Sequence, residues 1–302
     1  MKSTATEMPS TINTSKGGVL SVLADLIKAR LTGLVLLTTL VGFYLGNQGP
    51  KDFVLLLTTM LGVGLLASGA AALNQYLERD FDALMPRTKD RPIPAGHISA
   101  DRTLVFGGLL AVLGLVQLAL FVNLLTSLLG VITIALYLFV YIPLKRVTSL
   151  NTIIGAVPGA LPPLMGWTAA RGSIDIEGWS LVAILFFWQL PHFLAIAWMY
   201  RDQYEDAGYV MLPNVDPSGQ QTGRQAVSYT LGLLPISLCP AVFGISGGIY
   251  FIGATIFTLA FLACAVSFAR NLTHQTARRL FFCSIIYLPI LLGFMVFDKV
   301  DG

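Results

Sequence analysis

The sequence predicts an all-α protein that crosses a membrane many times, and three observations support this fold class. The 302 residues are 55% hydrophobic and only 12% charged, and the mean hydropathy is +0.74. So few charges cannot cover the surface of a water-soluble fold. The apolar residues occur in runs long enough for helices that span a bilayer, which takes roughly 20 residues. Short polar segments separate these runs. We therefore expect a polytopic helical bundle.

The apolar runs predict nine transmembrane helices. They lie at residues 26–46, 53–75, 104–122, 125–143, 152–169, 179–198, 228–245, 248–268 and 280–297. Small residues at close spacing in the second run predict that a neighbouring helix packs tightly against it. The fifth run is interrupted by Pro158, Pro162 and Pro163. Because such interruptions are tolerated where the backbone lines a cavity, we expect an apolar chamber there.

The chain is expected to form one domain after a short tail. Residues 1–20 are rich in Ser, Thr and Gly and lack the features of a signal peptide, so they are interpreted as a disordered cytoplasmic tail. Residues 21–302 then form the membrane domain. The three cysteines lie within apolar runs without the spacing of a zinc site, which predicts neither zinc nor a disulfide framework. The net charge of +3 is too small to indicate nucleic-acid binding.

The basic residues predict which way the chain crosses the membrane. Of the 19 Lys and Arg, all but Lys51, Arg171 and Lys299 fall on the side that carries the N-terminus. Such residues stay cytoplasmic in short loops, so the N-terminus is expected inside and the C-terminus outside. Two long loops, about 79–103 and 199–227, lie on the cytoplasmic side, and function is expected there. They are four crossings apart, which indicates two four-helix halves and one terminal helix.

A first polar cluster follows the second apolar run. Asn74, Glu78 and Asp82 recur every four residues, so their side chains share one face of a helix. Carboxylates stacked on one helix face repel one another and are costly near lipid, and a hard divalent cation would compensate for this charge. The pattern therefore predicts Mg²⁺. Arg87 and Arg91 come next, and their guanidinium groups suit the oxygens of a diphosphate. Three prolines in this stretch predict an extended segment after the helix. The alternative is an acidic helix end that simply pairs with a basic, topology-setting loop.

A second polar cluster follows the sixth apolar run, on the same side of the membrane. Asp202 and Asp206 are one helical turn apart and are predicted to hold a second metal ion. Arg201 and Tyr204 add a cation and a hydroxyl group for binding a ligand. The alternative is a solvated amphipathic helix in a loop.

Two kinds of side chain within the apolar runs carry expectations of their own. His192 lies inside the sixth run, where an imidazole is costly to bury, so it is a functional candidate. A packing residue that bonds to a neighbouring carbonyl is the alternative. Trp167, Trp179 and Trp198 fall near the ends of the predicted spans, which is typical of residues at the membrane interface.

These motifs are similar to those of a known family. The pattern NxxxExxxD at 74–82, followed by RTxxRP at 87–92, resembles the first aspartate-rich motif of the UbiA superfamily of intramembrane prenyltransferases. Residues 141–167 and 190–213 are similar to the branch of that superfamily that farnesylates haem. The resemblance extends over nearly the whole chain beyond residue 20. It implies a nine-helix bundle whose active-site cavity faces the cytoplasm.

The resemblance also implies an activity. It implies transfer of farnesyl from farnesyl diphosphate to a vinyl group of haem B, which gives haem O and diphosphate for the maturation of haem–copper oxidases. The implied cofactor is Mg²⁺, the implied location is the plasma (inner) membrane, and handover to a haem A synthase or to oxidase assembly is the implied partnership. A family member that uses a quinone precursor, and a membrane carrier of haem without catalysis, are the two alternatives.

By position, the resemblance assigns roles to individual residues. Asn74, Glu78 and Asp82 bind metal and diphosphate, and the arginines of the first cluster clamp phosphate oxygens. Separately from these positions, the setting of His192, Arg201 and Tyr204 makes them candidates for contact with haem, with the histidine as a ligand of the iron or a partner of a propionate. The sequence departs from the family in two places. Glu78 stands where many relatives have Asp, and Gln203 also replaces an Asp, so acidic neighbours, Asp202, Glu205 or Asp206, must supply a second acidic site.

Overall fold

The computed structural model describes residues 18–50 and 52–300 and is almost entirely helical. Most of the expected tail, residues 1–17, lies outside the described residues. Val19 and Leu20, which were also assigned to that tail, form the first turn of helix α1 instead.

Helices follow one another with short connections. Their bounds are α1 Val19–Leu26, α2 Ala29–Gly46, α3 Phe53–Asp82, α4 Ala100–Phe121, α5 Leu124–Ala135, the π-helix η1 Leu136–Tyr141, α6 Ile142–Leu144, α7 Asn151–Ala160, α8 Pro162–Arg171, α9 Ile176–Met199, α10 Arg201–Asp206, α11 Leu212–Val215, α12 Gln220–Val242, α13 Gly248–Asn271 and α14 His274–Phe297. Within the described residues, nine spans are long and apolar enough to cross a membrane. The predicted count is confirmed, and the protein is a multi-pass membrane protein.

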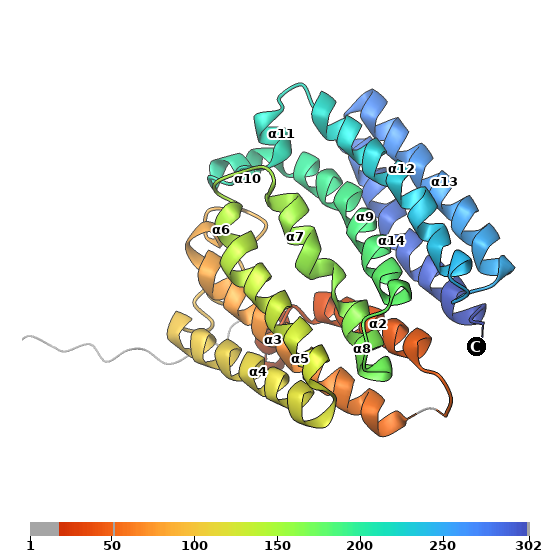
Figure 1. Ribbon diagram of the computed structural model, residues 1–302. Helices are drawn as coiled ribbons and strands as arrows, with labels where there is room; N and C mark the ends of the chain where they lie inside the picture. The colour runs from red at the N-terminus through yellow and green to blue at the C-terminus, as the bar shows by residue number, and fades with distance from the viewer. Residues whose placement is uncertain (1–17, 51, 301–302) are drawn as a thin grey trace, which may run out of the picture.

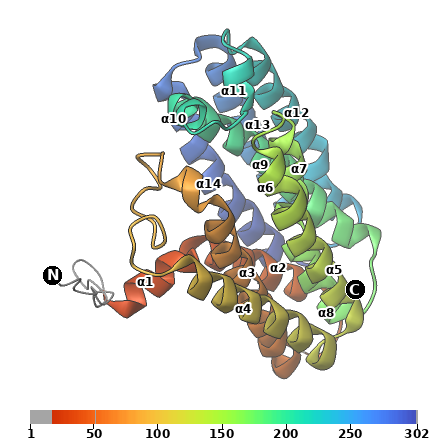
Figure 2. The ribbon, with the colours of Figure 1, turned by 90° about the vertical axis from the view of Figure 1, so that its left-hand side faces the viewer.

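The spans form a bundle whose two ends differ (Figures 1 and 2). Helices α3, α4 and α5 lie on one side, and α9, α12, α13 and α14 pack together on the other. The short helices α10 and α11 lie at one end of the bundle, and the C-terminus lies at the other (Figure 1). The segment after α3 lies at the same end as α10, so the two long loops meet there.

Small residues bring neighbouring backbones close together. A Cβ atom on Gly69 of α3 would lie 2.6 Å from the backbone nitrogen of Ala111 in α4, and one on Gly114 of α4 would lie 2.6 Å from that of Leu66. These distances are too short for any side chain, so the predicted tight packing against the second span is confirmed. Helices α2 and α8 pack in the same way, because a Cβ atom on Gly42 would lie 1.9 Å from the Pro163 carbonyl oxygen.

Two spans depart from a continuous α-helix, and both departures face the interior of the bundle. The fifth span is broken at Leu161 into α7 and α8, as the prolines predicted. The fourth span contains the π-helical stretch η1, a rare geometry that is often found at functional sites. Tyr137 and Tyr141 come from this stretch and stack on each other with ring centroids 5.8 Å apart.

Two of the three tryptophans predicted at the membrane interface are buried inside the bundle. Trp167 is only 1% exposed, and its Nε1 donates a hydrogen bond to Asp175 at 3.1 Å. Trp198 is also buried, with its ring edge toward Phe268. Both residues therefore pack between helices near the ends of their spans, whereas Trp179 is exposed, and a position at the membrane interface stays a prediction for all three.

Candidate active site

A cavity of about 420 Å³ opens between the helices and is lined by residues of six spans. Its walls are mostly apolar, with Leu66 of α3, Met165 of α8 and Leu185 of α9 among them. Pro158 and Pro162 of the broken fifth span also line it. The expected apolar chamber is therefore present, and the break in that span helps to form its wall.

The acidic stripe of α3 lies at the polar end of this cavity. Asn74, Glu78 and Asp82 are 1%, 4% and 2% exposed, and all three line the cavity. The Nδ2 group of Asn74 donates a hydrogen bond to Glu78 Oε2 at 2.9 Å. The four-residue spacing thus places these side chains on one buried face, as predicted.

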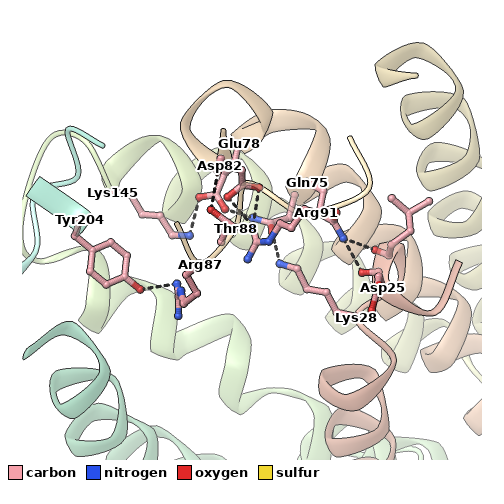
Figure 3. Close-up of polar contacts among 12 residues, drawn as sticks. Asp25, Lys28, Gln75, Glu78, Asp82, Arg87, Thr88, Arg91, Lys145 and Tyr204 are labelled. Atoms are coloured by element: carbon pink, nitrogen blue, oxygen red, sulfur yellow. Dashed lines mark hydrogen bonds and ion pairs between the residues drawn. The ribbon is translucent and has the colours of Figure 1, made fainter. Parts of the chain in front are cut away.

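Basic side chains from three separate segments surround this stripe (Figure 3). Lys145 Nζ lies 2.7 Å from Glu78 Oε1. Nη1 of Arg91 contacts both oxygens of Asp82, at 2.7 and 2.6 Å. Lys28 donates a hydrogen bond to the side-chain oxygen of Asn74. The carboxylates and the basic loop therefore pair with each other, which was the alternative reading of the first cluster, and they do so inside the cavity rather than in solvent.

The segment between the stripe and Arg91 follows a different path from the one predicted. Instead of an extended strand it forms successive turns, in which Thr88 and Lys89 both donate backbone hydrogen bonds to the Met85 carbonyl oxygen. The Thr88 hydroxyl also bonds to the carbonyl oxygen of Asp82 at 2.9 Å. The prolines do end the helix, but these hydrogen bonds fold the chain back over the mouth.

The charges at the mouth do not balance. Lys28, Arg87, Arg91 and Lys145 are the basic residues that line the cavity, whereas Glu78 and Asp82 are its two lining carboxylates, so basic groups outnumber acidic ones. Burial, together with nearby Arg91, lowers the pKa of Lys28 to about 7. For Lys145, burial acts against the charge but the Glu78 carboxylate outweighs it, so the pKa is raised well above its usual value. Such a site favours an added anion.

The second long loop reaches the same mouth, but through different side chains from those predicted. Arg87 Nη2 donates a hydrogen bond to the Tyr204 hydroxyl at 3.0 Å, and Tyr204 lines the cavity. Tyr209 lines it as well, with its ring centroid 5.8 Å from that of Phe81 in α3. The two loops therefore converge, as expected, through aromatic residues and an arginine.

The acidic residues of the second cluster lie elsewhere. Asp202 and Asp206 are exposed on α10, and neither is among the residues that line the cavity. Arg201 also points outward, pairing with Asp202 at 3.4 Å and lying over the Trp198 ring. On this six-residue helix Tyr204 takes the inward face. A second metal on Asp202 and Asp206 gains no support from this placement and stays a prediction, as does a haem contact for Arg201.

His192 lines the apolar part of the cavity. Its Nδ1 lies 2.7 Å from the Ser284 hydroxyl oxygen of α14, and its ring stacks between Trp188 and Phe281. The hydrogen-bond partner of His192 is therefore a side-chain hydroxyl group, whereas the packing alternative predicted a carbonyl group.

Several lining residues escaped the sequence reasoning. Lys28 and Lys145 were counted only as markers of orientation, although both lie at the ends of predicted spans, and this position was the available signal. Tyr141 and Tyr209 lie within the segments that carry the resemblance, at 141–167 and 190–213, but were given no role, and Tyr137 lies in no motif.

The arrangement suits a ligand with a charged head and an apolar body. Within residues 18–50 and 52–300 no group of three or more His, Cys, Asp and Glu side chains forms a complete metal site. Two carboxylates and an amide are nevertheless the ligand set that Mg²⁺ uses when a substrate phosphate completes its shell. The excess positive charge fits that phosphate.

Comparisons with known proteins agree with this geometry. Residues 35–286 match the UbiA prenyltransferase family. The protoheme IX farnesyltransferase of Solibacter usitatus is 45% identical over 284 residues, which cover 91% of this chain and 97% of that protein. The protein of the same name from Myxococcus xanthus is 41% identical over 283 residues, which cover 93% of this chain and 96% of that protein.

Solved structures with low identity share the fold. One of digeranylgeranylglyceryl phosphate synthase superimposes with a TM-score of 0.78 at 18% identity, covering 92% of this chain and 98% of that one. A UbiA homologue from Archaeoglobus fulgidus, bound to GPP and Mg²⁺, superimposes with a TM-score of 0.64 at 15% identity. The match covers 91% of this chain and 99% of that one.

Proposed function

Because the chain belongs to the UbiA prenyltransferase family, we propose that it transfers the farnesyl group of farnesyl diphosphate to a vinyl group of haem B, giving haem O and diphosphate. One geometric observation carries the proposal: four basic side chains and two carboxylates stand at the mouth of an otherwise apolar cavity. The similarity to proteins named protoheme IX farnesyltransferase, over more than nine-tenths of the chain, supports this choice of substrates.

The diphosphate is held at the mouth and the isoprenoid chain lies in the apolar part. Lys28, Lys145 and Arg91 now contact the oxygens of the acidic stripe, and they turn toward phosphate oxygens when the substrate enters. Asn74, Glu78 and Asp82 would hold Mg²⁺, which would neutralise negative charge on the diphosphate. The UbiA homologue from Archaeoglobus fulgidus, whose structure contains GPP and Mg²⁺, supports this choice of metal.

The reaction begins with loss of diphosphate. The allylic C–O bond breaks, its electron pair stays on the diphosphate oxygen, and the basic side chains at the mouth stabilise the charge that develops there. The vinyl group of haem B then donates its electron pair to the farnesyl cation, forming a C–C bond. Water adds to the resulting cation and loses a proton, which leaves a hydroxyethyl group. The apolar walls keep water from the first cation.

The haem lies beside the bound farnesyl chain, with His192 on the cavity wall and Tyr204 at the mouth. The distribution of basic residues among the loops supports a mouth that faces the cytoplasm at the plasma membrane, with the C-terminus outside. Product then passes to a haem A synthase or to oxidase assembly.

The test uses membranes that contain the intact protein, incubated with haem B, farnesyl diphosphate and Mg²⁺. Mass spectrometry of the extracted porphyrin is expected to find a product that has gained one farnesyl group and one hydroxyl group. A parallel reaction offers a hydroxybenzoate as a quinone precursor. Prenylation of that acceptor with unchanged haem would overturn the proposal in favour of a quinone pathway. Haem uptake into sealed vesicles without any chemical change would instead indicate a carrier.

A further inference from the structure

The apolar wall of the cavity contains a polar group that the diphosphate chemistry does not use. His192 of α9 stacks between two aromatic rings, with centroids 5.6 Å from Trp188 and 4.9 Å from Phe281. The interplanar angles are 24° and 27°. Because a ring lies nearly parallel to the imidazole on each side, the orientation of the imidazole plane is restricted.

Ser284 determines which imidazole nitrogen carries the hydrogen. Its Oγ lies 2.5 Å from the Phe281 carbonyl oxygen, an acceptor, so the single hydroxyl hydrogen is donated there. The same Oγ lies 2.7 Å from His192 Nδ1. Since the hydroxyl has no second hydrogen, it accepts a hydrogen bond from Nδ1–H. Trp188 Nε1 donates to the Ser284 carbonyl oxygen at 2.8 Å, which fixes this serine against α9.

The other nitrogen is then free to bind. A neutral imidazole carries one N–H, so a hydrogen on Nδ1 leaves a lone pair on Nε2. Across residues 18–50 and 52–300, no group forms a hydrogen bond with Nε2. His192 is half-buried, and its exposed part lines the cavity. A neutral imidazole nitrogen with a lone pair is a common ligand of metals in proteins.

We infer that Ser284 holds His192 in the tautomer whose Nε2 binds the iron of the haem substrate within the cavity. This inference rests on the proposed function, because the substrate supplies the iron. Metal-binding histidines commonly donate their other ring N–H to an oxygen atom, which fixes the ring and strengthens the ligand. Ser284 Oγ occupies that position. The contact also orients the porphyrin relative to the farnesyl chain, so Ser284 acts as a positioning residue.

The first experiment tests the ligand. Purified protein in lipid nanodiscs is titrated with ferric haem B, and the absorption spectrum is recorded. His192→Ala is expected to lose the spectrum of nitrogen-ligated iron and to regain it when imidazole is added. Binding of farnesyl diphosphate, measured with labelled substrate, is expected to be unchanged. An identical haem spectrum in the wild type and in His192→Ala would overturn the inference.

The second experiment tests the positioning residue. Ser284→Ala is expected to weaken ferric haem binding about 10-fold, which is the lower end of the usual loss when the hydrogen-bond partner of a metal-binding histidine is removed. Ser284→Thr keeps a hydroxyl group and is expected to restore the affinity. Ser237→Ala is a matched control, because Ser237 is equally buried and its hydroxyl donates to the carbonyl three residues earlier, but its other side-chain partner is Thr258 rather than His192. Equal haem affinity in Ser284→Ala and Ser237→Ala would overturn the role of Ser284.

The assay of the reaction separates the two ideas. Wild-type membranes that make haem O, together with an unchanged spectrum in His192→Ala, would leave the proposed function standing and remove the iron ligand. Wild-type protein that binds haem through His192 but never forms haem O would overturn the proposed function while the ligand stands.

Discussion

Nη2 of Arg87 lies 3.0 Å from the hydroxyl oxygen of Tyr204, and this hydrogen bond joins two loops that are 117 positions apart in the sequence. Arg87 also lies over the rings of Tyr200 and Tyr204, with its Cζ atom 5.0 and 5.5 Å from their centroids. The guanidinium group is therefore held at the mouth of the cavity before any substrate arrives. Preorganised charge of this kind favours binding of the diphosphate.

Loss of the tyrosine hydroxyl is expected to weaken substrate binding. Tyr204→Phe keeps the ring but removes the hydrogen bond, so the KM for farnesyl diphosphate should rise about fivefold, since such a bond contributes about 1 kcal/mol. Tyr200→Phe is the control, because Tyr200 contacts Arg87 through its ring. Steady-state kinetics in membranes measures both. Equal KM values for the two variants would contradict the role of this hydrogen bond.

Asp82 is expected to be essential. Asp82→Asn removes a carboxylate from the metal site, so turnover should fall about 100-fold or more, the usual effect of losing a preorganised charge at the reacting group. Asp80→Asn is the control, since Asp80 is on the same helix but its side chain is 76% exposed. Haem O formation is measured with equal amounts of membrane-inserted protein. Full turnover in Asp82→Asn would rule out the metal role.

Lys145 is expected to bind the diphosphate directly. Lys145→Gln removes a buried cation, and binding of farnesyl diphosphate should weaken roughly 10-fold or more, because hydrogen bonds between charged groups contribute roughly 1.5–3 kcal/mol. Arg146→Gln changes the loop charge equally, but Arg146 is exposed and packs over the Phe81 ring. The dissociation constant is measured by binding labelled farnesyl diphosphate to detergent-solubilised protein that elutes as a single species. Equal losses in both variants would indicate a general effect of loop charge.

The exposed acids of α10 are expected to matter little. A double variant, Asp202→Asn with Asp206→Asn, should keep turnover within about two- to threefold of wild type, because exposed substitutions usually change free energies by no more than about 0.5 kcal/mol. Assays over a range of Mg²⁺ concentrations measure this. A large rise in the Mg²⁺ requirement would instead support the second metal site that the sequence predicted.

Close contact of α2 with α8 is expected to stabilise the cavity wall. Gly42→Ala places a methyl group 1.9 Å from a backbone oxygen, so the midpoint of thermal unfolding in detergent should fall by roughly 4 °C or more. Gly33→Ala is the control on the same helix, because its Cβ meets no atom within 4 Å. If both variants unfold at the same temperature, the contact does not limit stability.

Local sequence patterns were sufficient for the spans and for the acidic stripe. Apolar run length determines how many helices can cross a bilayer, and a four-residue period places Asn74, Glu78 and Asp82 on one face. Both features depend only on neighbouring residues, so the sequence contains all the information needed. The same reasoning predicted the break in the fifth span from its prolines.

The remaining part of the site depends on contacts between distant segments. Lys28 lies 46 positions from Asn74, and Lys145 lies 67 positions from Glu78, so helix packing alone brings them together. The π-helical geometry around Tyr141 has no sequence signature that we recognised. On α10 the helix is too short for its period to distinguish an inward from an outward face, so the sequence did not show that Tyr204, rather than Asp202 or Asp206, lines the cavity.

The central claim is that farnesyl diphosphate and its metal bind at the acidic stripe of α3. Crystals grown with Mn²⁺ in place of Mg²⁺, and with a thiolodiphosphate analogue of farnesyl diphosphate, test it through the anomalous scattering of the manganese. We predict a peak within coordination distance of the Glu78 and Asp82 carboxylates, with the analogue's phosphates beside Lys145. A peak at Asp202 and Asp206, with the stripe still closed by its ion pairs, would contradict the account.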